Sequence, residues 1–169
     1  MKTAVLLACL LLAAGCLPAE TYMLLVDQRL DGQEDAARPD GLQGIMSGMF
    51  DLGQVTFDSG PYRPAADWDR LEFRESLSLA LEGMAHYLAT VRFDAASAAA
   101  EEGKPPAYSV RAVFQLWSAY DGSLLGQGEL STDNLGREKE LPYDDLLFKA
   151  GEMAAAELEA IAARSRRPG

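Results

Sequence analysis

Three aspartates follow short apolar runs of the sequence: Asp27 in LVDQ, Asp58 in TFDS and Asp94 in RFDA. If these runs are parallel strands, the carboxylates gather at the carboxyl edge of a sheet, where α/β domains usually bind ligands. Together with Asp31, they could hold Mg²⁺ or Ca²⁺ and serve a metal-dependent hydrolase. Alternatively, each aspartate makes a turn or caps a helix, which is common after strands. Because the loop spacing of an EF-hand is absent, we keep the aspartates as candidates and predict no metal site.

The other residues able to do chemistry form no recognisable arrangement. His86 is the only histidine, and it lies at a predicted helix-to-strand junction with no serine or cysteine motif beside it. Ser47 in GIMSG falls within a predicted helix, whereas the nucleophile of a serine hydrolase sits in G-x-S-x-G after a strand. No glycine-rich phosphate loop follows a predicted strand. We therefore interpret His86 as structural and predict neither a catalytic residue nor a cofactor.

Aromatic residues lie near two predicted loops. Trp117 and Tyr120 flank a predicted hairpin turn, and Trp68 lies with Tyr62 in the loop before the second predicted helix. Such residues can anchor a partner protein or a glycan. The alternative, which we favour for the pair at the hairpin, is that the aromatic rings cover one face of the sheet. We keep Trp68, Trp117 and Tyr120 as candidates for partner binding.

Cys16 ends a signal-like segment that closes with LLAAGC. Lys2 supplies a positive start, and residues 4–14 form an uncharged apolar run of eleven residues. A helix that spans a bilayer needs about 20 residues, so this run fits the hydrophobic region of a secretory signal. The small residues 13–15 before Cys16 resemble a bacterial lipobox, although Ala13 stands where leucine is more usual. The resemblance implies cleavage before Cys16 and attachment of lipid to its thiol.

Two alternatives exist for this segment. Ordinary cleavage after Ala19 would give a soluble secreted protein that begins at Glu20, but Leu17 is large for the position three residues before the cut. A buried helix would have an amphipathic face, and residues 4–15 have none. We therefore expect a signal peptide over 1–15, a short tether over 16–20 and lipidation of Cys16.

Composition limits the mature chain further. Cys9 lies within the signal, so a chain that begins at Cys16 has no second cysteine for a disulfide or a thiolate site. The 15 basic residues become 14 when Lys2 is removed, against 26 acidic ones, which changes the net charge from −11 to −12. Such a surface repels nucleic acid and anionic head groups. We expect no nucleic-acid partner, and attachment to the membrane through the N-terminal lipid.

Residues 21–163 predict a single α/β domain, followed by a tail over 164–169. TYMLLVD is typical of a strand buried on both faces, and QRLDGQEDAARPD after it of a polar loop. VRAVFQLWSAYDGSLLGQGEL predicts a hairpin with a tight turn at Asp121-Gly122. The predicted order β-α-β-α-β-β-β-α covers 21–27, 39–53, 54–58, a helix that begins at Asp67 or Asp69 and runs to 85, then 87–94, 108–117, 123–130 and a last helix that begins at 142 and finishes at the arginines 164–167. This order predicts an α+β sandwich of one mixed sheet with about five strands and three helices.

Helical spacing also predicts how the helices pack. In the first helix, Gly44 and Gly48 are expected to allow close approach to the sheet. The apolar stripe of the second helix consists of Phe73, Leu77, Ala80, Leu81 and Met84. The stripe of the third consists of Leu147, Ala150, Ala154, Leu158 and Ile161.

Three stretches resemble small envelope domains: those of the curli-secretion lipoprotein CsgG, the amino-terminal domain of TolB and the peptidoglycan-synthase activator LpoB. The stretches are YMLLVD with the following helix and VTFD, then ALEGMAHYLATVRFD, then the predicted hairpin. The resemblance covers most of residues 21–163, and it implies an α/β fold, a place in the bacterial envelope and a binding or accessory role. The sequence lacks the pore segment of CsgG, the propeller of TolB and the long tether of LpoB. No functional residue is therefore carried over.

We expect a non-enzymatic lipoprotein of the bacterial cell envelope that binds another envelope protein. Leu17, and not an aspartate, follows the cysteine, which favours the outer membrane and its periplasmic side. The alternatives are the metal-dependent hydrolase and the soluble secreted protein. An enzyme requires Asp27, Asp58 and Asp94 to converge within about 6 Å, whereas a binding module requires dispersed carboxylates and an exposed apolar patch.

Overall fold

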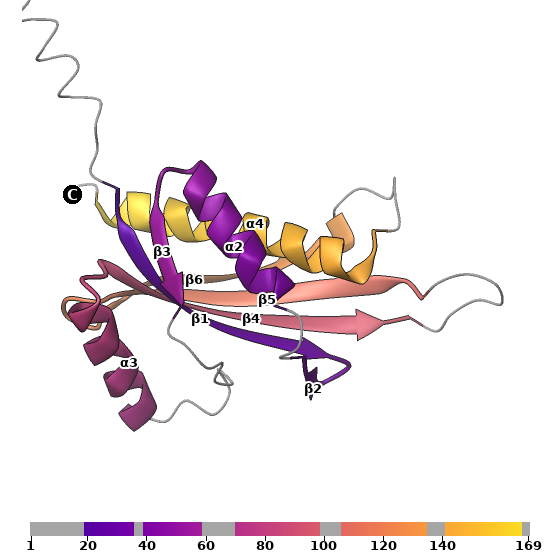
Figure 1. The fold of residues 1–169 in the computed structure, drawn as a ribbon, viewed down its shortest axis with the longest axis horizontal. Helices are drawn as coiled ribbons and strands as arrows, with labels where there is room; N and C mark the ends of the chain where they lie inside the picture. The colour runs from indigo at the N-terminus through magenta and orange to yellow at the C-terminus, as the bar shows by residue number, and fades with distance from the viewer. Residues whose placement is uncertain (1–18, 36–38, 59–69, 99–105, 135–140, 167–169) are drawn as a thin grey trace, which may run out of the picture.

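Six strands and three α-helices make up the part of the chain that the computed structural model describes, namely residues 19–35, 39–58, 70–98, 106–134 and 141–166 (Figure 1). The helices are α2 (Asp40–Asp51), α3 (Arg70–Glu82) and α4 (Tyr143–Ser165). The strands are β1 (Thr21–Leu30), β2 (Gln33–Glu34), β3 (Val55–Asp58), β4 (Tyr87–Ser97), β5 (Tyr108–Ser118) and β6 (Leu124–Ser131). A 3-10 helix, η2 (Thr132–Asn134), follows β6. The predicted order is confirmed, with β2 added to the five expected strands.

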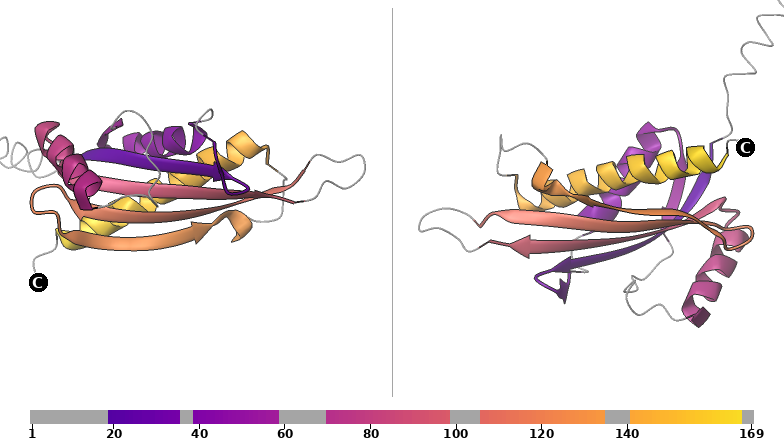
Figure 2. Two further views of the ribbon diagram at one scale, coloured as in Figure 1. Left: turned by 90° about the horizontal axis from the view of Figure 1, so that it is seen from below. Right: turned by 180° about the vertical axis from the view of Figure 1, so that it is seen from behind.

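The strands form one mixed sheet. Its order is β2-β1-β4-β5-β6, and β3 pairs with the first half of β1. β1 is parallel to β3 and β4, while β2, β5 and β6 are antiparallel to their neighbours. Helices α2 and α4 cover one face, and α3 lies on the other face at one end (Figures 1 and 2). The predicted α+β class is confirmed.

The segment predicted as a polar loop after Asp27 instead extends β1 and forms a hairpin. β1 continues to Leu30, and β2 returns beside it with Arg29 opposite Glu34. The turn consists of Asp31 and Gly32, with φ angles of 51° and 78°. Positive φ at both central residues is the geometry for which Asp-Gly is favoured in two-residue hairpins. The predicted loop is wrong because this Asp-Gly pair closes a hairpin.

The hairpin of β5 and β6 is confirmed, but its predicted tight turn is wrong. Residues 119–123 form a five-residue connection, in which the Ser118 N–H donates to the Ser123 carbonyl at 2.9 Å. Gly122 has a φ of 70°. The carboxylate of Asp121 instead accepts hydrogen bonds from the N–H and hydroxyl of Ser123, at 3.0 and 2.8 Å. This is an Asx turn, in which an aspartate side chain bonds to the backbone N–H two residues further on. It takes the place of the tight two-residue turn.

The main core lies between the sheet and the pair α2 and α4. The stripe predicted for the last helix is buried throughout, and from β5 the core receives Val110, Ala112, Phe114 and Leu116. Between them lie Arg111, Val113 and Gln115 on the other face, as in a strand with one face in the core. Among the described helices, none is long and apolar enough to cross a membrane.

Helices α2 and α4 approach each other closely at glycines. A Cβ atom on Gly44 would collide with the carbonyl oxygen of Phe148, and one on Gly48 would lie 2.8 Å from the Cβ of Ala155. The predicted approach of Gly44 and Gly48 to the sheet is therefore wrong, since both face α4. Gly41 is the residue that approaches the sheet, where a Cβ would lie 2.6 Å from the ring of Phe93.

Helix α3 makes a smaller contact with the second face of the sheet. Leu77 and Ala80 pack there in a cluster with Met23, Leu25 and Leu88. The predicted stripe is only partly buried: Leu81 is 48% and Met84 is 82% exposed. Met84 lies beyond the last helical residue, so the helical period no longer determines its direction. The side chain of Phe73 lies outside the described part of the chain.

Candidate functional site

The face of the sheet opposite α2 and α4 carries rows of polar side chains. α3 packs on it only near the amino end of β1, over the cluster of Met23, Leu25 and Leu88. Beyond α3, none of the described helices covers this face (Figures 1 and 2). Parallel strands are usually covered on both faces, whereas the described helices cover this face only beneath α3, although Asp27 and Thr90 on it are buried. The open face, as we name it, comprises Asp27, Arg29, Thr90, Arg92, Asp94, Arg111, Val113, Gln115, Gln127 and Glu129.

Charges alternate on the half of the open face formed by β1 and β4. Asp27 lies opposite Arg92, and Arg29 lies opposite Asp94. Within each strand the Nε of the arginine lies 3.0 Å from Oδ2 of the aspartate two residues away, in the pairs Arg29–Asp27 and Arg92–Asp94. Asp27 is 1% exposed, and a carboxylate at such depth stays ionised only beside a partner. The arginines therefore neutralise both aspartates.

The centre of the open face is hollow. A cavity of about 170 Å³ is lined by Thr90, Arg92, Val113 and Gln115. The side chain of Gln115 accepts a hydrogen bond from the Thr90 hydroxyl and donates one to Gln127, each at 3.4 Å. Both distances are at the long limit for hydrogen bonds. These amide groups are therefore held weakly and are available to a ligand or partner.

Arg111 and Glu129 form the outermost ion pair of the open face. Their side chains are 56% and 54% exposed. The hydrogen bond from Arg111 holds the pKa of Glu129 below its usual value. An exposed pair of this kind contributes little to stability, because water screens its charges. Either side chain can therefore turn toward a partner with little loss to the fold.

The three candidate aspartates do not converge. Asp27 and Asp94 share the open face but lie three residues inside β1 and β4, because both strands continue past them. Asp58 is the last residue of β3 and pairs with Leu24 of the main core, which places it on the opposite face. Within the described residues, no three His, Cys, Asp or Glu side chains are grouped to hold a metal ion. The convergence that a metal-dependent hydrolase requires is thus not found.

Asp31 and His86 each make local structural contacts. The carboxylate of Asp31 accepts hydrogen bonds from the hydroxyl and N–H of Ser97 at 2.6 and 2.9 Å, which lower its pKa. His86 accepts at Nδ1 a hydrogen bond from the Thr21 N–H at 3.0 Å. Its backbone N–H donates to the Thr21 carbonyl at 2.8 Å. Both residues therefore fix the ends of strands.

The aromatic candidates are separated. Trp117 is half-buried and packs against the cluster beneath α3. Tyr120 is 89% exposed in the loop between β5 and β6. These two residues therefore do not cover the sheet as a pair, and of the two, Tyr120 presents its ring to solvent. Trp68 lies outside the described residues.

A second polar cluster surrounds the point where the chain enters the domain. The carboxylate of Glu20 lies 3.0 Å from Nη1 of Arg166 and accepts a hydrogen bond from the Tyr87 hydroxyl at 3.0 Å. Arg166 also pairs with Glu159, which accepts a hydrogen bond from the Tyr22 hydroxyl. Burial, followed by the bond to Glu20, raises the pKa of Tyr87 to about 12. This entry cluster fastens the amino end of β1 to the carboxyl end of α4.

Sequence reasoning missed the arginines of the open face and the entry cluster. The alternation of β5 placed Arg111 and Gln115 on the face away from the core, and Arg92 precedes Asp94 by the two residues that put side chains on one face of a strand. These spacings could have revealed the neutralised aspartates. Nothing local joins Glu20 to Arg166, which are distant in sequence.

No protein-family model matches the sequence, and no curated protein matches it either. Solved structures resemble its fold. A lipoprotein from Neisseria meningitidis is 14% identical, with 86% of this chain and 99% of that chain covered at a TM-score of 0.46. TolB from Acinetobacter baumannii is 13% identical, with 90% of this chain and 30% of TolB covered at a TM-score of 0.41. The C-terminal domain of LpoB from Salmonella enterica is 13% identical, with 73% and 90% covered at a TM-score of 0.37.

The resemblance to TolB and LpoB predicted from the sequence is thus confirmed as a likeness of fold. This chain spans less than a third of TolB. Likeness at these identities and TM-scores identifies no ligand, partner or reaction.

Proposed function

We propose that this chain is a non-enzymatic lipoprotein of the bacterial cell envelope, whose domain binds another envelope protein through the open face. In this proposal residues 1–15 are a signal peptide that is removed, and Cys16 is acylated. The short tether 16–20 then holds the domain 21–163 at the membrane. The support for the anchor is the segment LLAAGC after an uncharged apolar run. Leu17 after the cysteine favours the outer membrane, on its periplasmic side.

The observation that carries the binding function is the half of the sheet beyond α3, which none of the described helices covers. It carries arginines and carboxylates in matched pairs and has a hollow at its centre that is lined by polar side chains and Val113. Rims and centres of protein interfaces commonly combine arginine with hydrogen-bonding side chains. A partner that presents both signs of charge and a few amide or hydroxyl groups would fit this surface.

The arrangement of the aspartates favours binding over catalysis. A general acid or base needs a pKa moved toward neutrality, for which carboxylates are placed close together or away from cations. Here Asp27 and Asp94 each lie beside an arginine, and Asp58 lies on the other face.

The test compares two matched glutamine-to-arginine variants of the tagged full chain in its native membrane. Gln115→Arg places a long charged side chain in the central hollow, whereas Gln43→Arg makes the same change on the exposed side of α2. Proteins cross-linked to the wild type should be lost from Gln115→Arg and retained by Gln43→Arg. Retention of every partner by Gln115→Arg would contradict the assignment of the open face.

A further inference from the structure

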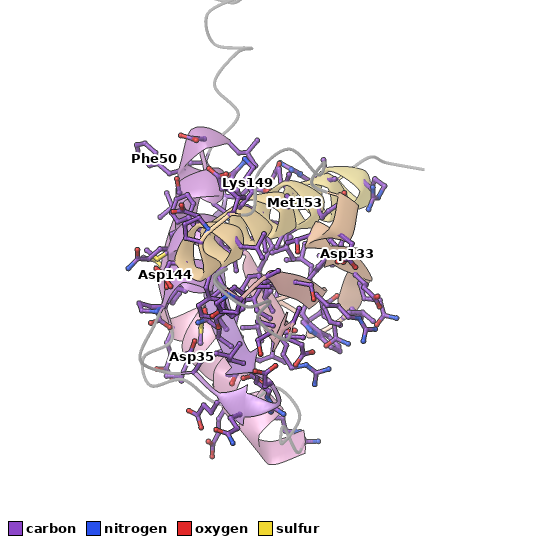
Figure 3. All side chains as sticks on the ribbon, turned by 90° about the vertical axis from the view of Figure 1, so that its right-hand side faces the viewer. Asp35, Phe50, Asp133, Asp144, Lys149 and Met153 are labelled. Carbon is purple, nitrogen blue, oxygen red and sulfur yellow. The ribbon has the colours of Figure 1, made fainter. Side chains whose placement is uncertain are left out.

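The three most exposed large apolar side chains of the described residues lie at one end of the molecule. Phe50 is 78% exposed near the end of α2, Met84 is 82% exposed after α3, and Tyr120 is 89% exposed between β5 and β6. Figure 3 shows Phe50 projecting away from the body of the domain. Large apolar side chains exposed together mark contact surfaces. Val55 and Leu124, which are also exposed, begin β3 and β6 at the same end.

Strand register establishes that these side chains share one end. Val55 pairs with Thr21, the first residue of β1, and Tyr22 pairs with Tyr87 at the start of β4. Tyr87 pairs in turn with Ser118, the residue at which the Tyr120 loop begins. The helices α2 and α3 therefore both finish at the edge where β1 starts. We name the surface formed by Phe50, Val55, Met84, Tyr120 and Leu124 the entry end.

Met84 occupies a backbone position that normally selects glycine. Its φ is 55°, and Ala85 N–H donates to the Ala80 carbonyl while Met84 N–H donates to that of Leu81. α2 ends in the same hydrogen-bond pattern, in which Gly53 takes the left-handed position with a φ of 77°. A residue other than glycine is strained in the left-handed conformation, because its Cβ atom comes too close to the following carbonyl oxygen. A strained residue that exposes a large apolar side chain points to a use for that side chain.

The chain enters the domain at this same end. The Glu20 N–H donates to the Gln54 side chain at 2.7 Å, and the Val55 N–H donates to the Glu20 carbonyl at 2.8 Å. With Glu20 fixed, only the stretch from Cys16 to Glu20 separates an acylated cysteine from the domain, a span of at most roughly 14 Å. The eleven residues of β4 span about 35 Å. A lipid on Cys16 would thus hold the entry end, and not the opposite end, within reach of the bilayer.

We propose that the entry end rests on the lipid surface, with Phe50, Met84 and Tyr120 inserted among the head groups. The inference rests on the proposed lipid anchor at Cys16 and adds an orientation: the open face then stands perpendicular to the membrane. The contact is apolar and not electrostatic, because the mature chain, with 14 basic against 26 acidic residues, carries a net charge of −12 and would be repelled by anionic lipid. Apolar side chains buried at the interface add to the membrane affinity that an attached lipid chain provides.

The experiment places one fluorophore at a time on the mature, acylated protein reconstituted in phosphatidylcholine vesicles. An acylated Cys16 has no thiol and Cys9 is removed with the signal, so Phe50→Cys, Met84→Cys or Tyr120→Cys supplies the single labelling site. Leu141→Cys is the matched control, because Leu141 is an exposed apolar residue before α4, at the opposite end. Labels at the entry end should be quenched several times more by a lipid-borne nitroxide than by aqueous iodide, and the label at Leu141 by iodide alone.

Each other outcome overturns the inference in a recognisable way. Equal quenching by iodide at all four sites, on protein that stays vesicle-bound, would mean that the entry end faces water. Protection from both quenchers would mean that a second copy or another protein covers it. A wild-type protein that takes up label at Cys16 and does not bind vesicles would instead refute the lipid anchor itself.

Discussion

Met84 holds a left-handed backbone conformation with an exposed apolar side chain. Met84→Gly should raise the free energy of unfolding by about 0.5–1 kcal/mol, because relief of the strained φ outweighs the greater freedom of glycine in the unfolded chain. Denaturant unfolding of the purified protein measures the change. The matched control is Gly53→Ala, whose Cβ would meet no atom within 4 Å, so that only backbone strain should lower stability. An unchanged or lowered stability of Met84→Gly would contradict the strain at this residue.

Tyr22 and Tyr87 make stability depend on alkaline pH. Burial and bonds to glutamates raise the pKa of both hydroxyls, that of Tyr87 from 10.0 to about 12. The folded state keeps protons that the unfolded state releases near pH 10, so their contribution is complete below pH 10 and is lost as the pH rises toward 12. Unfolding followed from pH 9 to 12 should show a shallower loss in the double variant Tyr22→Phe/Tyr87→Phe. The exposed Tyr120→Phe should keep the wild-type slope, and a double variant with that same slope would refute the coupling.

At the residue scale, the sequence located the aspartates but not their role. An aspartate after an apolar run looks the same whether the strand ends or continues beside an arginine. In DQR and RFD, the decisive information is the two-residue spacing of Arg29 from Asp27 and of Arg92 from Asp94. Asp58 could not be placed, because its face depends on the register of β3 against β1.

Glycines set the separation of α2 and α4 at the element scale. Helix propensity alone predicts that Gly44→Ala stabilises an exposed helix by up to about 1 kcal/mol. The structure predicts the opposite sign, since a Cβ would collide with the backbone of Phe148. Overpacking of this kind should lower the free energy of unfolding by about 1–3 kcal/mol or more. Thermal and denaturant unfolding decide the sign, and a stabilised Gly44→Ala would show that the helices are farther apart.

The two Asp-Gly pairs show why elements are predicted better than the turns between them. Asp31-Gly32 closes a two-residue turn because β1 stays paired with β4 to its end, where the Asp31 N–H donates to the Ala95 carbonyl at 2.9 Å. Asp121-Gly122 lies in a longer loop because the Asp121 side chain bonds to Ser123. The dipeptide is the same in both places, and pairing beyond the turn decides its geometry.

For the whole molecule, periodicity predicted the order of elements and the core stripe of α4, because both are local patterns. Contacts between distant segments decide the strand order and the parallel pairing of β1 with β4. They also decide which half of the sheet the described helices leave without cover. The entry cluster of Glu20, Arg166 and Glu159 is of this kind, and it brings Glu20 beside the end of α4.

The central claim, a lipid anchor on Cys16, is tested most directly by the intact mass of the native protein recovered from membranes. We predict a chain that begins at Cys16 with the added mass of diacylglycerol and a further acyl group, and a Cys16→Ala variant that keeps its signal peptide. A native chain that begins at Glu20 without lipid and is found in the periplasmic fluid would contradict the account.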